Sequence, residues 1–559
     1  MSYEPKIGKQ LVRMLMFQLY PEAETIYREY LQNACDSILK AIDIGFLKPN
    51  DACIDIKIDA YKNKIEILDN GTGIQSCFVE QVLKDVAISQ KQKEKMSAGQ
   101  FGIGRLVGGG YCKHLIFETS YEGEDKKSIL IFDIDKTDLL LKEENNLDAS
   151  QLINEVTILK TEPYPKEHRF FKVTLKDIKP EYSEILLNEE KIKNYLVQVA
   201  PLSYKAEFKK ELLDKAIDKL DIDDKNKYLE RLNHLNQVKI CLNDEDIVKQ
   251  YSLNIDGTGD QIEELRLFDF YDQTENNIGE LAWGWYAISK FSTQISDFDV
   301  KQGNKPVLTR GIRLRDHNIQ IGKQDYLNDY FKQARSNLYF IGEIHIINNG
   351  INPTTDRSGI APSWQSVELD RQISDFFRKE LESLYQNANK LKKSIERKEK
   401  AQNDFEEISK KGINKTYTKE LKENDLDSLR NSISNADDEL LNFVKKSEKN
   451  NVYKSLLNAY RESNNDIFPV IEEPKIDYKA GDKDSNKEDE KIKSPNIVPP
   501  PPKNNQTIEE RIELLKDKLN TREFNIVTNI VQILNSSITT KEQKNKIITE
   551  IIKTLLKMK

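Results

Sequence analysis

Apolar residues recur along the chain at intervals that predict helices and strands in a definite order. From Thr25 to Ala41 they lie three and four positions apart, which predicts an amphipathic helix. Residues 63–68 alternate between polar and apolar side chains, which is typical of a strand with one buried face. A second helix is expected at residues 188–199. Three further strands are expected at residues 280–285, 311–315 and 339–347.

From residue 368 onward the pattern becomes that of long helices. Apolar residues recur there at alternating intervals of four and three, at Phe377, Leu381, Leu384, Ala388, Leu391 and Ile395. This seam fits either a short coiled coil or a helical hairpin that folds back onto helices near residues 426–462.

The last part of the chain changes character twice. Residues 474–506 combine charge runs with the prolines 499–502 and few apolar residues, which predicts a disordered linker. Residues 507–559 carry apolar stripes on two or three expected helices. So short a module does not easily bury its apolar stripes alone, so we expect it to self-associate or to dock on a protein partner.

Composition narrows the class of partner. The 559 residues include 85 Lys or Arg against 93 Asp or Glu, a net charge of −8, which gives no support to binding of nucleic acid or an anionic membrane. Five cysteines lie scattered without paired metal spacing, which favours a reduced, cytoplasmic setting. No apolar run approaches the ~18 residues that cross a bilayer, so no membrane partner is expected.

The first candidate motif lies on the helix expected at residues 25–41. Spacings of four and three place Glu29, Asn33 and Asp36 on one stripe. A carboxylate at Glu29 can act as a base toward water, and the amide oxygen of Asn33 can bind Mg²⁺. Taken alone, the stripe also fits a solvated polar face.

The second motif, Asp69-Asn-Gly71-Thr-Gly73, directly follows the strand expected at residues 63–68. Asp69 at the strand end can accept a hydrogen bond from the amine of adenine, and Gly73 lets backbone approach the ring. Taken alone, the motif also fits an ordinary turn.

The third motif is a glycine-rich segment behind a polar stretch, Ser89 to Ser97, that could act as a lid. Its glycines let backbone amides converge on phosphate oxygens. A dinucleotide-binding loop is the competing interpretation, but no strand leads directly into the segment. The residues concerned are Gly99, Gln100, Phe101, Gly102, Ile103 and Gly104.

Together, the three motifs resemble the GHKL superfamily of ATPases, which includes topoisomerase II ATPase subunits, 90 kDa heat-shock chaperones, histidine kinases, MutL and MORC proteins. The amino-acid sequences around Glu29 and Gly99 are most similar to those of the heat-shock chaperones. The resemblance implies that ATP and Mg²⁺ are cofactors. It also implies that Glu29 is the hydrolytic base, Asn33 the metal ligand, Asp69 the adenine contact and Asp36 a support of the pocket.

One departure concerns residues 167–175, the stretch that corresponds to the family's last core strand. The family places a Gly-Thr pair before its last core strand, and this chain has none there. Thr174 could serve the adenine side only if the strand register is shifted.

The segment from 201 to 363 resembles the superfamily's transducer domain, in which a loop cation reaches the terminal phosphate. Arg357 follows the last expected strand, as the chaperones' phosphate-sensing arginine does, and is therefore our second catalytic candidate. Lys323 is the alternative cation, and an ordinary loop cation is the competing interpretation of both.

The expected fold class is α+β, with a Bergerat-type α/β sandwich followed by a transducer-like (ribosomal S5-like) domain and a helical carboxyl-terminal part. The expected domains are an ATPase domain at 1–185, a transducer at 186–365, a helical stalk or hairpin at 366–473, a linker at 474–506 and a helical module at 507–559.

The leading hypothesis is a Mg²⁺-dependent, chaperone-like ATPase that works as a clamp, in which two heads of a homodimer associate when ATP binds. A nucleic-acid clamp of the MutL or MORC type, serving bacterial DNA repair or phage defence, is the second hypothesis. A nucleotide-sensing scaffold with little hydrolysis is the third, although the intact Glu29 argues against it.

Overall fold

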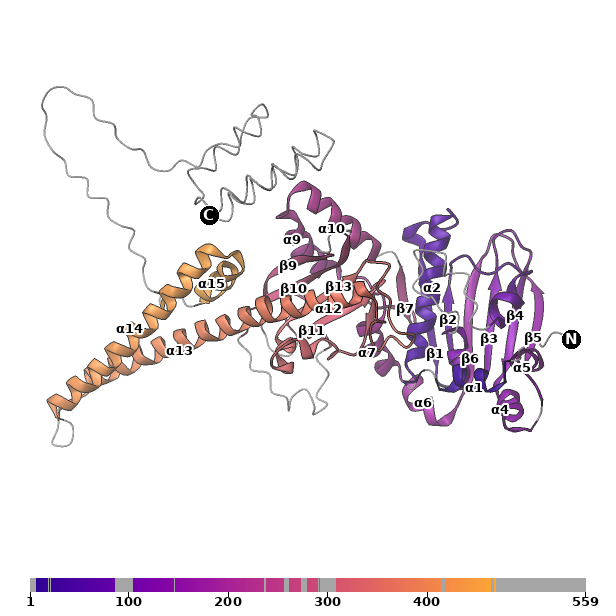
Figure 1. The fold of residues 1–559 in the computed structure, drawn as a ribbon, viewed down its shortest axis with the longest axis horizontal. Coiled ribbons are helices and arrows are strands. Elements are labelled where there is room, and N and C mark those ends of the chain that lie inside the picture. Colours follow the sequence, from indigo (N-terminus) through magenta and orange to yellow (C-terminus); the bar gives the residue numbers. More distant parts are fainter. Residues whose placement is uncertain are drawn as a thin grey trace, which may run out of the picture. The chain divides into compact units, whose positions relative to one another are not determined.

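The computed structural model of the chain describes two sheets and a set of helices (Figure 1). The described residues are 7–18, 20, 22–85, 104–144, 146–235, 238–255, 261–272, 279–289, 291, 308–413, 418–463 and 467–468. The expected lid at 89–97, the glycine segment 99–103, the linker 474–506 and the module 507–559 lie outside these residues. None of the helices within the described ranges combines the length and apolar character that a bilayer-spanning segment needs.

The first sheet has eight strands in the order β5-β4-β3-β6-β2-β1-β7-β8. Antiparallel pairs join its strands except at β1 and β7, which are parallel. The strands are β1 (Cys53–Asp59), β2 (Lys64–Asp69), β3 (Cys112–Ser120), β4 (Lys126–Asp133), β5 (Thr157–Pro163), β6 (Phe170–Ile178), β7 (Lys239–Leu242) and β8 (Glu245–Asp246).

One face of this sheet is apolar and the other is charged. Ile65 and Ile67 of β2 are buried in a core that also contains residues of helices α1 to α7, whereas Glu66 between them points to the opposite face. There Glu66 and Glu118 form ion pairs with Lys172. The helices are α1 (Gln10–Phe17), α2 (Thr25–Asp43), α3 (Val79–Lys84), α4 (Ile134–Lys142), α5 (Ala149–Val156), α6 (Pro180–Leu186) and α7 (Glu189–Val199), with short turns η1 (Pro49–Asp51) and η3 (Gly104–Gly110).

Strand β7 comes from the segment expected to begin the second domain. The chain first forms α7 and then four short helical segments before it returns to pair with β1. The amino-terminal sheet therefore includes residues well beyond 185. The intervening segments are α8 (Ala206–Phe208), the π-helical η4 (Lys209–Asp214), α9 (Lys215–Asp218) and α10 (Ile222–Leu235).

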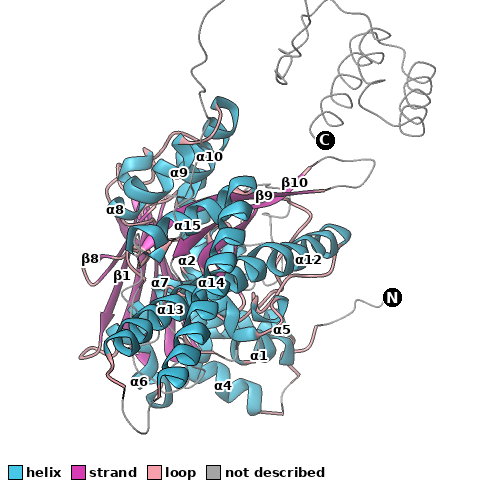
Figure 2. Cartoon of the chain, turned by 90° about the vertical axis from the view of Figure 1, so that its left-hand side faces the viewer, coloured by secondary structure: helices cyan, strands magenta, loops and turns pink. Residues whose placement is uncertain are grey.

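The second sheet has five strands in the order β12-β11-β13-β10-β9, and Figure 2 shows β9 beside β10. Alternate residues of β10 enter two different cores, because Trp283 and Trp285 pack with α8 to α10 while Tyr286 and Ile288 pack with the later helices. The two tryptophans are thus core residues. The strands are β9 (Ile262–Tyr271), β10 (Glu280–Ser289), β11 (Gly311–Asp316), β12 (Ile319–Ile321) and β13 (Ile341–Ile346), with η5 (Asn328–Tyr330) and η6 (Ala334–Tyr339) between β12 and β13.

The carboxyl-terminal helices form a hairpin that returns to this sheet (Figure 1). The apolar seam that begins at Phe377 packs against Leu440, Phe443 and Val444 of the returning helix, so the seam serves an intramolecular hairpin. The helices are α12 (Trp364–Phe376), one π-helical turn η7 (Phe377–Leu381), α13 (Glu382–Lys410), α14 (Lys419–Lys449) and α15 (Asn451–Ser463). The α+β fold class predicted from the sequence is confirmed.

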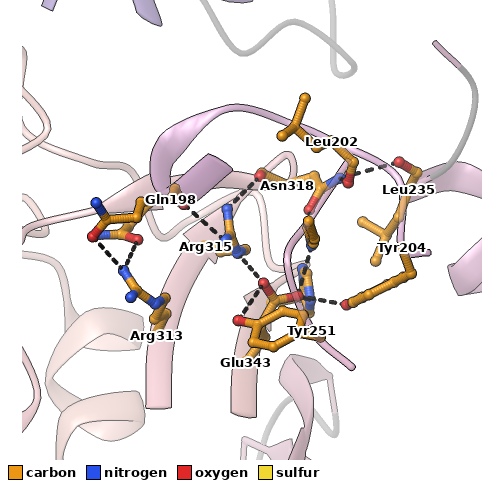
Figure 3. Close-up of polar contacts among 12 residues, drawn as sticks. Gln198, Leu202, Tyr204, Leu235, Tyr251, Arg313, Arg315, Asn318 and Glu343 are labelled. Carbon is orange, nitrogen blue, oxygen red and sulfur yellow. Dashed lines mark hydrogen bonds and ion pairs between the residues drawn. The ribbon is translucent and has the colours of Figure 1, made fainter. Parts of the chain in front are cut away.

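A buried carboxylate, Glu343 of β13, organises the polar interior of the second sheet (Figure 3). Its two oxygens accept hydrogen bonds from Arg315 (2.5 Å), Lys249 (2.7 Å), Tyr204 (2.5 Å) and Tyr251 (3.1 Å). Burial alone would raise the pKa of Glu343, but Arg315 and Lys249 outweigh it and hold that pKa well below its usual value. Burial lowers the pKa of Lys249 to about 7.

The same cluster joins the second sheet to the amino-terminal domain. Arg315 also donates to the backbone oxygen of Gln198 on α7 (2.9 Å), and Asn318 donates to the backbone oxygen of Leu202 (3.2 Å). Arg315 is itself held by Glu343, and Asn318 accepts a hydrogen bond from Lys249. The cluster therefore fixes the end of β11 against α7 (Figure 3).

Substituting Glu343 by Gln should be strongly destabilising. The variant leaves Arg315 and Lys249 buried without their shared counter-charge, and Arg315 cannot release its proton. We expect the free energy of unfolding to fall by about 3–5 kcal/mol in urea denaturation. The control is Glu184→Gln, whose exposed ion pair with Lys191 should contribute no more than about 0.5 kcal/mol. A change in the Glu343 variant as small as in the control would contradict the assignment.

Candidate functional site

Helix α2 presents the first expected motif on one side, as its spacing predicts. Glu29 and Asp36 are buried and Asn33 is half-buried. The two oxygens of Glu29 accept hydrogen bonds from Arg28 (3.2 Å) and from the Tyr20 hydroxyl (3.3 Å). Burial, together with the charge of Glu29, raises the pKa of Tyr20, so the phenol remains a donor. The Glu29 carboxylate is therefore held in one orientation.

The second motif forms a tight turn at the end of β2. The Asp69 carboxylate is 2% exposed and accepts a hydrogen bond from the Gly71 amide (2.9 Å). Gly73 has a positive φ of 64°, and a Cβ there would lie 2.0 Å from the Ser120 carbonyl oxygen. A Cβ at Gly71 would lie 2.2 Å from Ser37 Oγ. Both glycines are therefore required by the packing of the turn.

This turn is tied to α2 beside Asp36. The Thr72 amide donates to Ser37 Oγ (3.1 Å). Burial raises the pKa of the Cys35 thiol, and the nearby carboxylates of Asp36 and Asp69 add to the effect. The structure thus brings the first two motifs together, with both carboxylates near one protonated thiol.

Of the third motif, the structure describes Gly104. A Cβ at this glycine would lie 2.7 Å from the Glu29 carboxylate. The Tyr30 hydroxyl of α2 donates to the Arg105 carbonyl (3.0 Å) and accepts from the Gly108 amide (3.0 Å). The carboxyl end of the glycine segment is therefore anchored on α2 next to Glu29.

The register of β6 places Thr174 away from these residues. Thr174 lies directly opposite Glu66, whereas Phe171 lies opposite Asp69. Because opposite residues share a face and neighbours alternate, Thr174 points to the charged face of the sheet. Its Oγ1 is buried and has no hydrogen-bond partner among the described residues. Thr174 therefore lies on the opposite face of the sheet from Asp69.

A different hydroxyl supports the Asp69 turn. Thr119 of β3 lies opposite Phe171, on the Asp69 side of the sheet, and is 1% exposed. Its Oγ1 accepts from the Ile74 amide (2.9 Å) and donates to the Phe170 carbonyl (3.0 Å). In the sequence its only signal is a hydroxyl near the end of an apolar segment, which does not reveal the pairing of β3 with β6.

A loop of the second domain reaches α2 through Arg357. Its guanidinium donates to Gln32 Oε1 (3.0 Å) and pairs with Asp316 of β11 (3.3 Å), and the side chain is 3% exposed. Burial lowers the pKa of Arg357, and the charges of Asp316 and Glu29 oppose that effect. Arg357 has a positive φ of 53°, a conformation that costs a residue with a Cβ about 1–2 kcal/mol.

Lys323 lies in a different environment. Its ammonium pairs with Glu22 (2.5 Å), before the start of α2, and its side chain is 74% exposed. Of the two cations considered from the sequence, Arg357 is the one buried against the helix that carries Glu29.

The residues fit a magnesium nucleotide. Asn33 offers an amide oxygen, and buried carboxylates flank it on the same helix. Gly71 and Gly73 let the turn pack closely beside the buried Asp69 carboxylate, because a Cβ at either position would clash with neighbouring protein atoms.

Comparison with known proteins agrees with this geometry. Residues 22–160 match a family model described as histidine kinase-, DNA gyrase B- and HSP90-like ATPase. The chain is 30% identical to chaperone protein HtpG of Wigglesworthia glossinidia brevipalpis over 114 residues, 17% of this chain and 18% of that protein. It is 28% identical to HtpG of Buchnera aphidicola subsp. Baizongia pistaciae over 186 residues, 30% of this chain and 29% of that protein. It is 33% identical to HtpG of Pseudoalteromonas translucida over 113 residues, 17% of this chain and 18% of that protein.

The chain thus covers less than a third of the length of these relatives. The matched family segment contains α2, the Asp69 turn and Gly104. The family resemblance predicted from the three motifs is therefore confirmed for residues 22–160.

Two threonines on opposite faces of the sheet test the register. Thr119→Val removes the acceptor of the Ile74 amide, so we expect a loss of about 1–3 kcal/mol in the free energy of unfolding. Thr174→Val replaces an unpartnered buried hydroxyl by a methyl group and should be neutral or slightly stabilising. Thermal denaturation measures both. A larger loss for Thr174→Val than for Thr119→Val would contradict the register.

Proposed function

We propose, from the premise that residues 22–160 form a GHKL-type ATPase domain, that this chain binds ATP with Mg²⁺ and hydrolyses it to ADP and phosphate. The output is a chaperone-like change of conformation. ATP can drive such a change because it contacts the open and closed states differently.

The adenine end of the nucleotide is assigned to the turn after β2. The Asp69 carboxylate accepts the hydrogen bond of the exocyclic amine, and its position is fixed by the Gly71 amide. Gly73 lets the backbone of the turn approach the ring. Asp36 supports the same pocket from α2.

The phosphate end is assigned to α2 and the glycine segment 99–104. Asn33 binds Mg²⁺ through a neutral oxygen, which adds no negative charge beside the phosphates. When bound, the ion neutralises charge on the phosphate oxygens. Backbone amides of the glycine segment cradle the same oxygens, and Gly104 brings its end to Glu29.

Glu29 is assigned as the base that orients water and accepts its proton. Its carboxylate is buried, and the hydrogen bonds from Arg28 and Tyr20 fix its direction. A positioned base of this kind is what a hydrolase requires and a passive nucleotide sensor does not.

The observation that carries the proposal is the contact of Arg357 with α2. The Arg357 guanidinium, supplied by the second domain, donates to Gln32, the residue before Asn33 in the sequence, and the charge of Glu29 acts on it. Phosphoryl transfer spreads negative charge over the transferred group, which a positioned guanidinium stabilises. The same arginine would report the state of the nucleotide to β11, through Asp316.

We assign the conformational output to a clamp formed by two chains whose heads associate when ATP is bound, with a protein as client. The name of the HtpG relatives and the net charge of −8 favour a protein client over a nucleic acid. The carboxyl-terminal helices are the proposed surface for the partner.

Glu29→Gln tests the catalytic assignment. The variant keeps the size of the side chain but loses its basicity, so ATP turnover should fall about 100-fold or more while ATP affinity changes little. Turnover is measured by phosphate release and affinity by calorimetry with Mg²⁺. In sedimentation velocity, ATP should hold this variant as a dimer.

The matched control is Asp69→Asn, which should abolish ATP binding and leave the protein monomeric with ATP. Undiminished turnover in Glu29→Gln would refute the base. An ATP-independent sedimentation coefficient in both variants would refute the clamp.

Arg357→Ala tests the coupling between domains. Removing a charge that stabilises the transition state more than bound ATP should lower kcat about 100-fold with little effect on ATP affinity. Lys323→Ala is the control, because its exposed ion pair with Glu22 should leave kcat within about two-fold. If the two variants gave the opposite order of effects, Lys323 would be the phosphate-sensing cation.

A further inference from the structure

Two thiols and a carboxylate converge on the charged face of the first sheet. Cys53 and Asp55 lie on β1 and Cys241 lies on β7, and one ligand atom from each lies within 4.8 Å of the others. The parallel register sets Asp55 directly opposite Cys241. Because Ile54 points into the core, its neighbours Cys53 and Asp55 share the opposite face.

A second carboxylate extends the group onto β8. Asp246 is paired with Cys241 in the antiparallel register, and the Cys241 thiol donates to Asp246 Oδ1 (3.2 Å). Lys239 contacts the same oxygen (2.9 Å). The three strands thus present two sulfur and two carboxylate groups on one surface.

The surroundings suit a cation. Cys241 is 7% exposed, and Cys53 and Asp55 are half-buried. The Cys241 thiol donates to Asp246, and the Asp55 carboxylate lies directly opposite on β1, so two carboxylates flank this thiol. A coordinated thiol loses its proton to the solvent when a divalent cation binds.

We propose that Cys53, Asp55 and Cys241 bind one zinc ion, and that the exposed Asp246 side chain leaves its ion pair with Lys239 to become the fourth ligand. Zinc takes four ligands in a tetrahedron and accepts both thiolates and carboxylates. Mg²⁺ and Ca²⁺ prefer oxygen ligands alone, so this site is chemically distinct from the one assigned to the nucleotide. The inference goes beyond the proposed function and does not depend on it.

The site would join three strands beside the nucleotide motif. Asn70, which follows Asp69, accepts a hydrogen bond from the Cys53 amide (3.0 Å) and donates to the Asp51 carbonyl (2.7 Å). A metal ion at Cys53 therefore stabilises the strand that supports the Asp69 turn, together with the parallel pairing of β1 with β7.

The test is metal binding by the full-length chain, reduced and stripped of metal. Zinc affinity is measured by competition with a chromophoric chelator, and Co²⁺ is added to reveal thiolate coordination through its charge-transfer band. We expect one ion per chain, the thiolate band, and a raised melting temperature with zinc. Cys53→Ser and Cys241→Ser should each weaken binding at least 100-fold, whereas Cys77→Ser, at an exposed thiol elsewhere, should not.

A second measurement uses the unmodified chain, in case the variants fold poorly. Zinc should protect Cys53 and Cys241 from alkylation, as mapped by mass spectrometry, and leave Cys77 reactive. Asp55→Asn should weaken binding without removing a thiol. Equal binding by all three serine variants, or protection of neither Cys53 nor Cys241, would overturn the proposal.

Discussion

The position of Arg357 against α2 depends on one buried carboxylate. Glu343 neutralises Arg315, and Arg315 holds β11 against α7 through the backbone of Gln198. The next residue of the same strand, Asp316, binds the guanidinium of Arg357. Two neighbouring residues of β11 therefore have different roles. Arg315 fixes the strand to the amino-terminal domain, and Asp316 fixes Arg357, which contacts α2. Loss of the Glu343 carboxylate would lower the free energy of unfolding strongly, because it would leave buried cations unpaired.

Features encoded by neighbouring residues could be predicted from the sequence. The helix from Thr25 emerges as α2, and the strand after residue 63 as β2, because each has a periodic apolar face that packs on a core. The helix after Asn188 begins there because that side chain caps it. The resemblance to the GHKL superfamily predicted that the three motifs form one site. The structure brings Glu29 next to Gly104 and the Asp69 turn next to α2.

Features that depend on distant pairing could not be predicted. The face on which Thr174 lies is decided by the register of β6 against β2, which no local pattern specifies. A lysine is usually exposed, so the sequence gives no sign that Lys249 is buried. Its burial is explained by the ion pair with Glu343 of β13. The apolar seam of α13 fits a coiled coil and a hairpin equally well in the sequence. In the structure the seam packs against Leu440 of α14, which makes it part of a hairpin. Cys53 and Cys241 meet only because β7 joins β1.

Strand β7 is synthesised long after β1, the strand with which it pairs. While the nascent chain is shorter than residue 239, β1 is the border of its sheet and has unsatisfied backbone groups along one side. Such a border can pair with any other extended chain, so the interval spent translating α7 to α10 is a period of exposure to misassembly. Arrival of β7 ends that period, and an excised amino-terminal fragment would carry the exposed border permanently.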